Sequence, residues 1–359
     1  MIETAQPAPV HRPDQPTEAP LVSWRHRHLL DVDVLGWPEL DLVMRTTDAM
    51  KEVLGRPIQK VPALRGRRVT TLFYEASTRT RVSFEVAARN LSADVVSVST
   101  GTSSVTKGES LVDTIRTLEA LGAEILVMRH AVSGAPYLAA QVFGGHVLNG
   151  GDGWHAHPTQ ALLDLYTMRE TLPGGTVRGR KVVILGDILH SRVARSNIWS
   201  LTAAGADLWL CGPATFLRGL EGWARAWTGP DGGGAVPGHG RFRVTSDLAA
   251  ALRDADVVMT LRIQKERMQG GLLPSLREYA DRFGLTAERL ALARPEALVM
   301  HPGPVNEGVE LAPDLVAHAR SVITAQVANG VAVRMALLYL LSGGKPGPAH
   351  ELGAPEGLA

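Results

Sequence analysis

The sequence alternates short apolar runs with longer segments in which apolar residues recur every three or four positions. Each apolar run ends in a polar or glycine-rich loop. This alternation is typical of parallel βαβ units, because two parallel strands need a crossover long enough to hold a helix. We therefore expect an α/β fold of two doubly wound domains, each with a central, mainly parallel sheet flanked by helices. We expect the active site in the cleft between the domains.

The expected strands divide between two halves of the chain, separated by a segment rich in proline and glycine at 172–180. The first half holds strands at 69–73, 94–98, 124–128 and 146–148, and the second at 181–185, 207–211, 242–245, 256–260 and 297–300. Residues 1–20 are expected to be a disordered tail, 21–171 the first domain, 172–325 the second domain, 326–342 a helix packing back on the first domain, and 343–359 a flexible tail. The glycine-rich stretch 229–240 is interpreted as a surface insertion.

The composition excludes several classes of protein. Lys and Arg (37) nearly balance Asp and Glu (36), which argues against a nucleic-acid-binding surface based on net charge. The longest apolar stretches, such as 331–341 with Arg334 inside it, are too short to cross a bilayer. The single cysteine, Cys211, excludes an intrachain disulfide and a cysteine-rich zinc site. With no signal-peptide pattern, the cytoplasm is the expected location.

The stretch 73–85, FYEASTRTRVSFE, is interpreted as a turn from a buried strand into a helix. The hydroxyls of Ser77, Thr78 and Thr80 and the free N–H groups of the first helical turn converge there with the guanidinium of Arg79. Such a turn binds anions, and phosphate is the natural occupant. The alternative is an ordinary Ser/Thr helix cap followed by an exposed arginine.

Polar and cationic residues also follow the other expected strands, where ligands bind in open parallel sheets. They are Ser103, Lys107, Arg129, His157, Gln160, Arg192, Arg262 and Gln264, and the last strand leads to Gly303 and Pro304. Arginine and lysine recur at these positions and paired carboxylates do not. Because arginine forks suit carboxylates and phosphates, this pattern predicts ligands with at least two separate negative groups. For Lys107, in a Gly/Ser loop, a solvated lysine without a ligand stays an alternative.

The histidines of this chain allow other interpretations. His155 and His157 form an H-x-H pair beside Asp152, which could hold a divalent metal, as in metal-dependent amide hydrolases. The alternative places His157 at a helix start, donating to a polarised oxygen. His190 and His301 are expected to be structural. No G-x-G-x-x-G follows the strand at 181–185, so a nicotinamide cofactor is not expected.

Several longer motifs, in consistent order between residues 24 and 341, resemble the catalytic chains of aspartate carbamoyltransferases, within the wider aspartate/ornithine carbamoyltransferase family. They are STRTRVSFE (77–85), SVTKGES (104–110), MRH (128–130), HPTQALLDL (157–165), GDILHSRVARSN (186–197), LRIQKERM (261–268) and HPGPVNEGVE (301–310). The K-G-E and R-x-Q-K-E-R segments favour aspartate as acceptor. The H-C-L-P segment of an ornithine enzyme is replaced by HPGP.

The resemblance implies transfer of the carbamoyl group of carbamoyl phosphate to the amine of L-aspartate, giving N-carbamoyl-L-aspartate and phosphate in pyrimidine (UMP) biosynthesis. The first domain is then the carbamoyl-phosphate-binding domain and the second the aspartate-binding domain. The implied carbamoyl-phosphate site is Ser77, Thr78, Arg79, Thr80, Arg129, His157, Gln160, Gly303 and Pro304. The implied aspartate site is Lys107, Arg192, Arg262 and Gln264, and the implied catalytic residues are Arg79, Thr80, Lys107, Arg129 and His157.

The resemblance also implies a homotrimer with shared active sites, in which Ser103 and Lys107 reach the neighbouring subunit's site, and it implies neither metal nor cofactor. Glu307 departs from the family pattern, where arginine is expected. Three alternatives stay open: another acceptor such as ornithine, a scaffolding role in a pyrimidine multienzyme assembly, and a larger assembly with regulatory or dihydroorotase-type chains.

Overall fold

Two parallel sheets organise the chain in the computed structural model, which describes residues 22–99, 109–228, 240–264 and 272–344. The first sheet contains β1 (Arg68–Phe73), β2 (Asp94–Ser99), β3 (Ile125–His130) and β4 (His146–Asp152). The second contains β5 (Lys181–Leu185), β6 (Asp207–Cys211), β7 (Arg241–Thr245), β8 (Val257–Thr260) and β9 (Leu298–Met300). All neighbouring strands in both sheets are parallel, which confirms the predicted α/β class.

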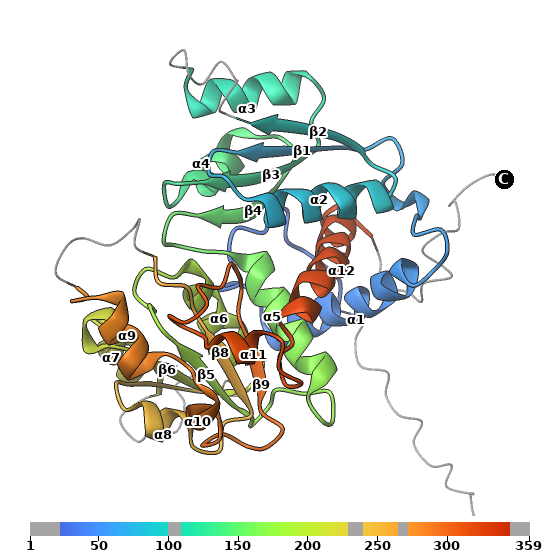
Figure 1. The fold of residues 1–359 in the computed structure, drawn as a ribbon. Coiled ribbons are helices and arrows are strands. Elements are labelled where there is room, and N and C mark those ends of the chain that lie inside the picture. The colour runs from blue at the N-terminus through green and yellow to red at the C-terminus, as the bar shows by residue number, and fades with distance from the viewer. Residues whose placement is uncertain (1–21, 100–108, 229–239, 265–271, 345–359) are drawn as a thin grey trace, which may run out of the picture.

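Helices flank both sheets (Figure 1). They are α1 (Trp37–Leu54), α2 (Thr78–Asn90), α3 (Leu111–Ala120), α4 (Ala135–Val142), α5 (Pro158–Thr171), α6 (Arg192–Ala203), α7 (Leu220–Thr228), α8 (Leu248–Leu252), α9 (Leu276–Phe283), α10 (Ala287–Leu290), α11 (Pro313–Val316) and α12 (Ile323–Leu341), with short 3₁₀ turns at Pro62–Leu64 and Ala214–Phe216. The predicted tail 1–20, the loop with Ser103 and Lys107, nearly all of the 229–240 segment and the chain beyond 344 lie outside the described residues.

Each strand predicted from the sequence is present: β5 and β6 have the predicted ends, and the ends of the other strands are shifted. The largest shift is in β4, which continues to Asp152 instead of ending at residue 148. The sequence of this extension has no apolar pattern, because side-chain hydrogen bonds stabilise it in place of apolar packing. The Asn149 side chain donates to Asp152 Oδ1 (2.7 Å) and to the Leu30 carbonyl (2.8 Å). Both Asn149 and Asp152 are fully buried.

The order of the strands creates one topological switch point in each sheet, which is the place where the connections from two adjacent strands run toward opposite edges. The orders are β2-β1-β3-β4 and β7-β6-β5-β8-β9. The chain therefore leaves β1 and β3 toward opposite edges of the first sheet, and β5 and β8 toward opposite edges of the second. A crevice opens between two such loops, which is where open α/β sheets bind ligands.

The last helix, α12, packs against α1, α2 and α5 (Figure 1). It begins at Ile323, a few residues before the expected start at 326. By length and apolarity alone it could cross a membrane, but 61% of its apolar window is buried inside the protein, as in the core helix of a globular domain. Its buried side chains belong to a continuous apolar cluster that includes residues of α1 and α5 and of β5, β6 and β8. The apolar core is therefore continuous from the helices α1, α5 and α12 to the second sheet.

Candidate active site

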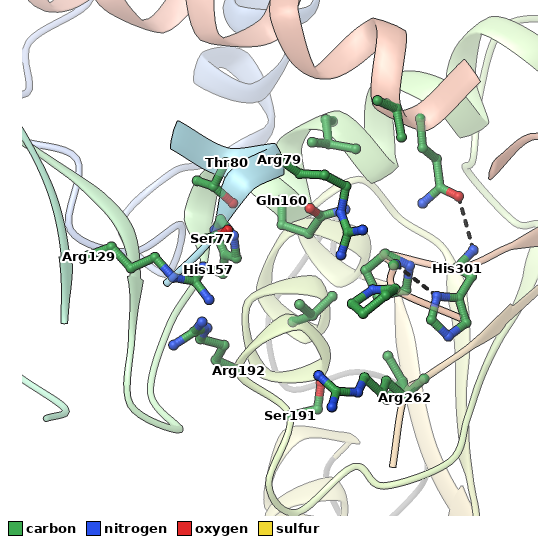
Figure 2. Close-up of a pocket in the computed structure, with 18 of the residues that line it drawn as sticks. Ser77, Arg79, Thr80, Arg129, His157, Gln160, Ser191, Arg192, Arg262 and His301 are labelled. Carbon is green, nitrogen blue, oxygen red and sulfur yellow. Dashed lines mark hydrogen bonds between the residues drawn. The ribbon is translucent and has the colours of Figure 1, made fainter. Parts of the chain in front are cut away.

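One pocket of about 1050 Å³ receives the loops that follow β1, β3, β4, β5, β8 and β9. Every predicted site residue within the described ranges lines it: Ser77, Thr78, Arg79, Thr80, Arg129, His157, Gln160, Arg192, Arg262, Gln264, Gly303 and Pro304. The structure thus brings the residues of both switch points together (Figure 2). The predicted contributions of Ser103 and Lys107 lie outside the described residues.

The turn after β1 opens helix α2 directly at the pocket. Ser77 is the residue before the helix, with extended backbone angles (φ −162°, ψ 95°), and its side chain makes no capping hydrogen bond. Ser77 thus occupies the N-cap position and Arg79 is exposed, as the helix-cap alternative expects, but the Ser77 hydroxyl does not cap the helix. The first N–H groups of a helix have no partner within the helix and carry partial positive charge. Together with the lining hydroxyls, they form a cradle for an anion.

Arg79 and Arg262 bring positive charge to the pocket from the two sheets. Burial lowers the pKa of the Arg79 guanidinium, and the charge of Arg262 lowers it further. Gly303 lies against Arg79, since a Cβ atom built on this glycine would come within 3.1 Å of the guanidinium carbon. Gly303 also has a φ of +70°, which side chains disfavour. A glycine here therefore lets the loop after β9 approach the arginine.

Glu75 links two further arginines and was missed by the sequence analysis. Its carboxylate accepts hydrogen bonds from Arg129 Nη2 (2.6 Å) and from both terminal nitrogens of Arg192 (2.9 and 3.0 Å). Arg129 lies in β3 and Arg192 begins α6, so this cluster joins the two halves of the pocket. Glu75 is a single carboxylate bound to arginines, so it differs from the paired carboxylates that were not expected at these strand ends. The signal was present as the lone acidic residue between β1 and Ser77.

Replacing Glu75 by glutamine should lower kcat/KM about 10–100-fold. The amide lacks the negative charge that pairs with both arginines, and its NH₂ group cannot accept the second hydrogen bond of Arg192. Arg129 and Arg192 are then held less firmly, and small displacements of positioning groups are costly. Steady-state kinetics with both substrates measures the loss. Glu85→Gln is the matched control, because Glu85 lies on α2 in ion pairs with Arg81 and Arg89, outside the pocket lining. Equal rates for Glu75→Gln and the unchanged chain would contradict the expectation.

His157 is held at the start of α5 by a buried chain of hydrogen bonds. Its backbone N–H donates to Ser196 Oγ (2.9 Å), and this hydroxyl donates to Asp31 Oδ1 (2.7 Å). Burial raises the pKa of Asp31 to about 6. His155 instead contacts Asp152, with Nδ1 3.2 Å from Oδ2. The two members of the H-x-H pair therefore have different partners.

Arg334 forms part of the pocket wall from the side of α12. It is only 4% exposed, its guanidinium carbon lies 5.0 Å from the centre of the Phe84 ring, and Nη1 donates to the Gly330 carbonyl (3.0 Å). Burial lowers its pKa to about 10, against the opposing effect of the Asp164 carboxylate. A single arginine within an apolar helix was the sequence signal for this residue.

The other residues singled out in the sequence have distinct places. His190 is buried outside the pocket lining, with Nδ1 2.8 Å from Asp187 Oδ1. His301 lines the pocket and accepts a hydrogen bond at Nδ1 from the Gly303 N–H (2.8 Å), so it supports the loop after β9. Glu307 is exposed and lies outside the lining, whereas the buried Glu310 lies 3.3 Å from His301 Nε2.

Comparison with known proteins extends this description. The model of the aspartate/ornithine carbamoyltransferase carbamoyl-phosphate-binding domain matches residues 27–170, and that of the Asp/Orn-binding domain matches residues 178–341. A protein of Roseiflexus sp. (strain RS-1), named aspartate carbamoyltransferase catalytic subunit, is 58% identical over 328 residues, covering 91% of this chain and 99% of the relative.

Solved structures agree with the matched sequence families. The aspartate transcarbamoylase of Trypanosoma cruzi in complex with carbamoyl phosphate superposes with a TM-score of 0.76 at 29% identity, covering 90% of this chain and 98% of the other. The ornithine carbamoyltransferase of Pyrococcus furiosus superposes with a TM-score of 0.75 at 27% identity, covering 90% and 99%. With its two parallel sheets and a cationic pocket between their switch points, the chain belongs to the aspartate/ornithine carbamoyltransferase family.

Proposed function

We propose that this chain transfers the carbamoyl group of carbamoyl phosphate to the amine of L-aspartate, releasing phosphate and N-carbamoyl-L-aspartate for pyrimidine biosynthesis. The observation that carries the proposal is the meeting of Arg79 from the first sheet and Arg262 from the second in one pocket. These two positive charges favour ligands that carry a negative group beside each arginine. The likeness to relatives named aspartate carbamoyltransferase supports aspartate as the acceptor.

The donor half is the part of the pocket around the start of α2. Here the Ser77–Thr80 turn binds the phosphate, with Arg79 beside it. Thr80, Arg129 and His157 donate to the carbonyl oxygen. The carbamoyl nitrogen donates to the amide oxygen of Gln160 and to backbone carbonyls near Gly303 and Pro304. All of these residues line the pocket.

The acceptor half holds the two carboxylates of aspartate. Arg262 binds one of them through its guanidinium fork, which matches the two oxygens of a carboxylate. Arg192, whose two terminal nitrogens donate to Glu75, binds the other through its remaining N–H groups. Gln264 lies close by in the pocket lining, and Lys107 is proposed to reach the same ligand. Closure of the two halves then brings Arg192 and Arg262 toward the phosphate.

Positioning and charge stabilisation account for the chemistry. The neutral amine of aspartate attacks the carbamoyl carbon, negative charge develops on the carbonyl oxygen, and the departing phosphate accepts the amine proton. Holding the two anions in line contributes about 7–11 kcal/mol. Each well-placed donor to the oxyanion contributes about 3–4 kcal/mol. Cations and N–H donors therefore matter more in this site than a pair of acid–base carboxylates.

The proposed assembly is a cytoplasmic homotrimer in which Ser103 and Lys107 enter the neighbouring subunit's site. Only the resemblance to the family supports this arrangement. A larger assembly with other pyrimidine enzymes is a separate possibility, tested by the size of the complex in a cell lysate.

Mixed trimers test the shared site. Arg79→Ala and Lys107→Ala chains should each be nearly inactive alone. If each site takes Arg79 from one chain and Lys107 from its neighbour, about a quarter of the sites in a randomly assembled 1:1 mixture are intact. Denaturing and refolding the mixed chains together, with each variant refolded alone as a control, should restore about that fraction of activity. No recovery in mixed trimers would refute the shared site.

The activity is tested with purified chain, carbamoyl phosphate and a panel of amino acids. We expect phosphate release and N-carbamoyl-L-aspartate with L-aspartate, and far slower turnover with L-ornithine. A preference for ornithine would assign the chain to the other branch of its family. No product with any acceptor at millimolar substrate would refute the proposal and favour a scaffolding role.

A further inference from the structure

A buried carboxylate, Asp164, lies directly behind the donor half of the pocket. It is fully buried in α5, one helical turn after Gln160, and does not itself line the cavity. Its Oδ1 atom accepts from Gln160 Nε2 (2.9 Å) and from Gln326 Nε2 (2.8 Å). Its Oδ2 atom accepts from Asn197 Nδ2 (2.9 Å). One carboxylate therefore receives amide N–H groups from α5, α12 and α6.

These contacts fix which way each amide points. An ionised carboxylate only accepts hydrogen bonds, so the NH₂ group of each amide must face Asp164 and the amide oxygen must face elsewhere. The Gln326 oxygen accepts from the backbone N–H of His301 (3.0 Å), at the start of the loop with Gly303 and Pro304. The Gln160 side chain lines the pocket, so its oxygen is the end of the amide that can meet a ligand there (Figure 2).

Because Asp164 is fully buried, its carboxylate depends on these particular partners. A buried carboxylate is costly unless hydrogen bonds and an opposite charge compensate it. Asp164 has three amide donors, and the Arg334 guanidinium lowers its pKa in opposition to the larger effect of burial, which raises it to about 6. The three N–H donors and the nearby guanidinium all favour the charged form of Asp164. An asparagine in its place would keep one oxygen that can accept from both glutamines, whereas a leucine removes both acceptor atoms.

We propose that Asp164 is a positioning residue that selects the carbamoyl group: it holds the Gln160 amide with its oxygen toward the donor and, through Gln326, holds the loop that carries Gly303 and Pro304. The inference rests on the proposed function, because it concerns recognition of the carbamoyl NH₂ group. Asp164 touches neither substrate, and its effect passes through two amides.

The consequence is a preference for an NH₂ group over a methyl group of similar size. Carbamoyl phosphate can donate to the Gln160 oxygen, whereas acetyl phosphate leaves this oxygen without a donor. Sites built to hydrogen-bond a substrate group discriminate strongly against analogues that lack it. Inorganic phosphate is the reference ligand, since it tests the cradle formed by the Ser77–Thr80 turn alone.

Asp164→Leu tests the proposal, because leucine has a similarly branched side chain and accepts no hydrogen bond. The probes are carbamoyl phosphate as substrate, and acetyl phosphate and inorganic phosphate as inhibitors competing with it. We expect the preference for carbamoyl over acetyl phosphate, given by the ratio of the inhibition constant to KM, to fall about tenfold or more. Inhibition by inorganic phosphate should stay within about twofold. A role of Asp164 in stability alone would not change this ratio.

Asn197→Leu is the matched control. It removes one donor to the same carboxylate, and the buried Asn197 Oδ1 makes no hydrogen bond within the described residues. This variant leaves the contacts of Gln160 and Gln326 in place, so it should lose stability while keeping the preference within about twofold. An equal fall in preference in Asn197→Leu and Asp164→Leu would overturn the positioning role.

Gln326→Met keeps the test decisive if Asp164→Leu does not fold. It leaves Asp164 charged while removing one donor and the support of the His301 N–H, and we expect the preference to fall in the same direction. An unchanged preference in whichever of the two variants folds overturns the inference. Failure of the proposed function would give a different result, because the unchanged chain would then form no carbamoyl aspartate at all.

Discussion

Replacing Arg79 by alanine is expected to lower kcat about 1,000-fold, with little change in thermal stability. Arg79 lies in the first turn of α2, beside Gly303 and opposite Arg262. In the proposed reaction it stabilises charge on the leaving phosphate and on the carbonyl oxygen. Stabilisation of developing charge in a partly buried site is the largest contribution that one side chain can make to such a transfer. The rate of carbamoyl aspartate formation at saturating substrates measures the effect.

Two further variants show whether the guanidinium itself is required. Arg79→Lys keeps the charge but loses the fork, so its rate should lie between those of alanine and arginine. Arg89→Ala removes an arginine near the exposed end of the same helix, where it forms an ion pair with Glu85, and should change kcat less than about twofold. A fall of less than tenfold in Arg79→Ala would place the phosphate elsewhere in the pocket.

Replacing Arg262 by alanine is expected to raise KM for L-aspartate about 100-fold while KM for carbamoyl phosphate changes little. Arg262 follows β8 at the switch point of the second sheet and lines the pocket. Two charge-assisted hydrogen bonds to a carboxylate contribute about 3 kcal/mol together. This free energy corresponds to about 100-fold in affinity. Initial rates at varied aspartate and saturating carbamoyl phosphate measure it.

The critical result for Arg262→Ala is a rise in KM for L-aspartate without a rise in KM for carbamoyl phosphate. Arg277→Ala is the matched control, because its side chain is 93% exposed on α9, and it should leave both KM values unchanged. An equal rise in both KM values for Arg262→Ala would show that Arg262 does not belong to the acceptor half alone. The division of the pocket into two halves would then be wrong.

Local patterns were sufficient to predict the elements of this fold. Strand residues such as those of β5 and β8 are buried on both faces, so they form continuous apolar runs that are visible in the sequence. Gly122, which follows α3, has the left-handed conformation (φ +85°) that favours glycine after a helix end. The same reasoning failed where polar hydrogen bonds replace apolar packing, as in the extension of β4 through Asn149 to Asp152.

The carboxylates of the site were harder to predict than its cations. Arg79 and Arg262 follow recognisable strands, so their places at the sheet edge were predictable. Glu75 and Asp164 act through partners distant in sequence: Glu75 contacts Arg192, and Asp164 contacts Gln326. No periodicity along the chain encodes such pairs. A buried carboxylate in an apolar helix is at most a sign that a partner exists.

By itself, the sequence determined the parallel α/β class, the strands and the cationic residues that follow them, because hydrophobic period and turn composition are local properties of the chain. Only the tertiary structure decided the order of the strands and therefore the two switch points. It also placed Arg79 opposite Arg262 in one pocket and joined Arg129 to Arg192 through Glu75. These relations depend on packing between segments far apart in sequence, which buries one set of side chains and directs another into a common cavity.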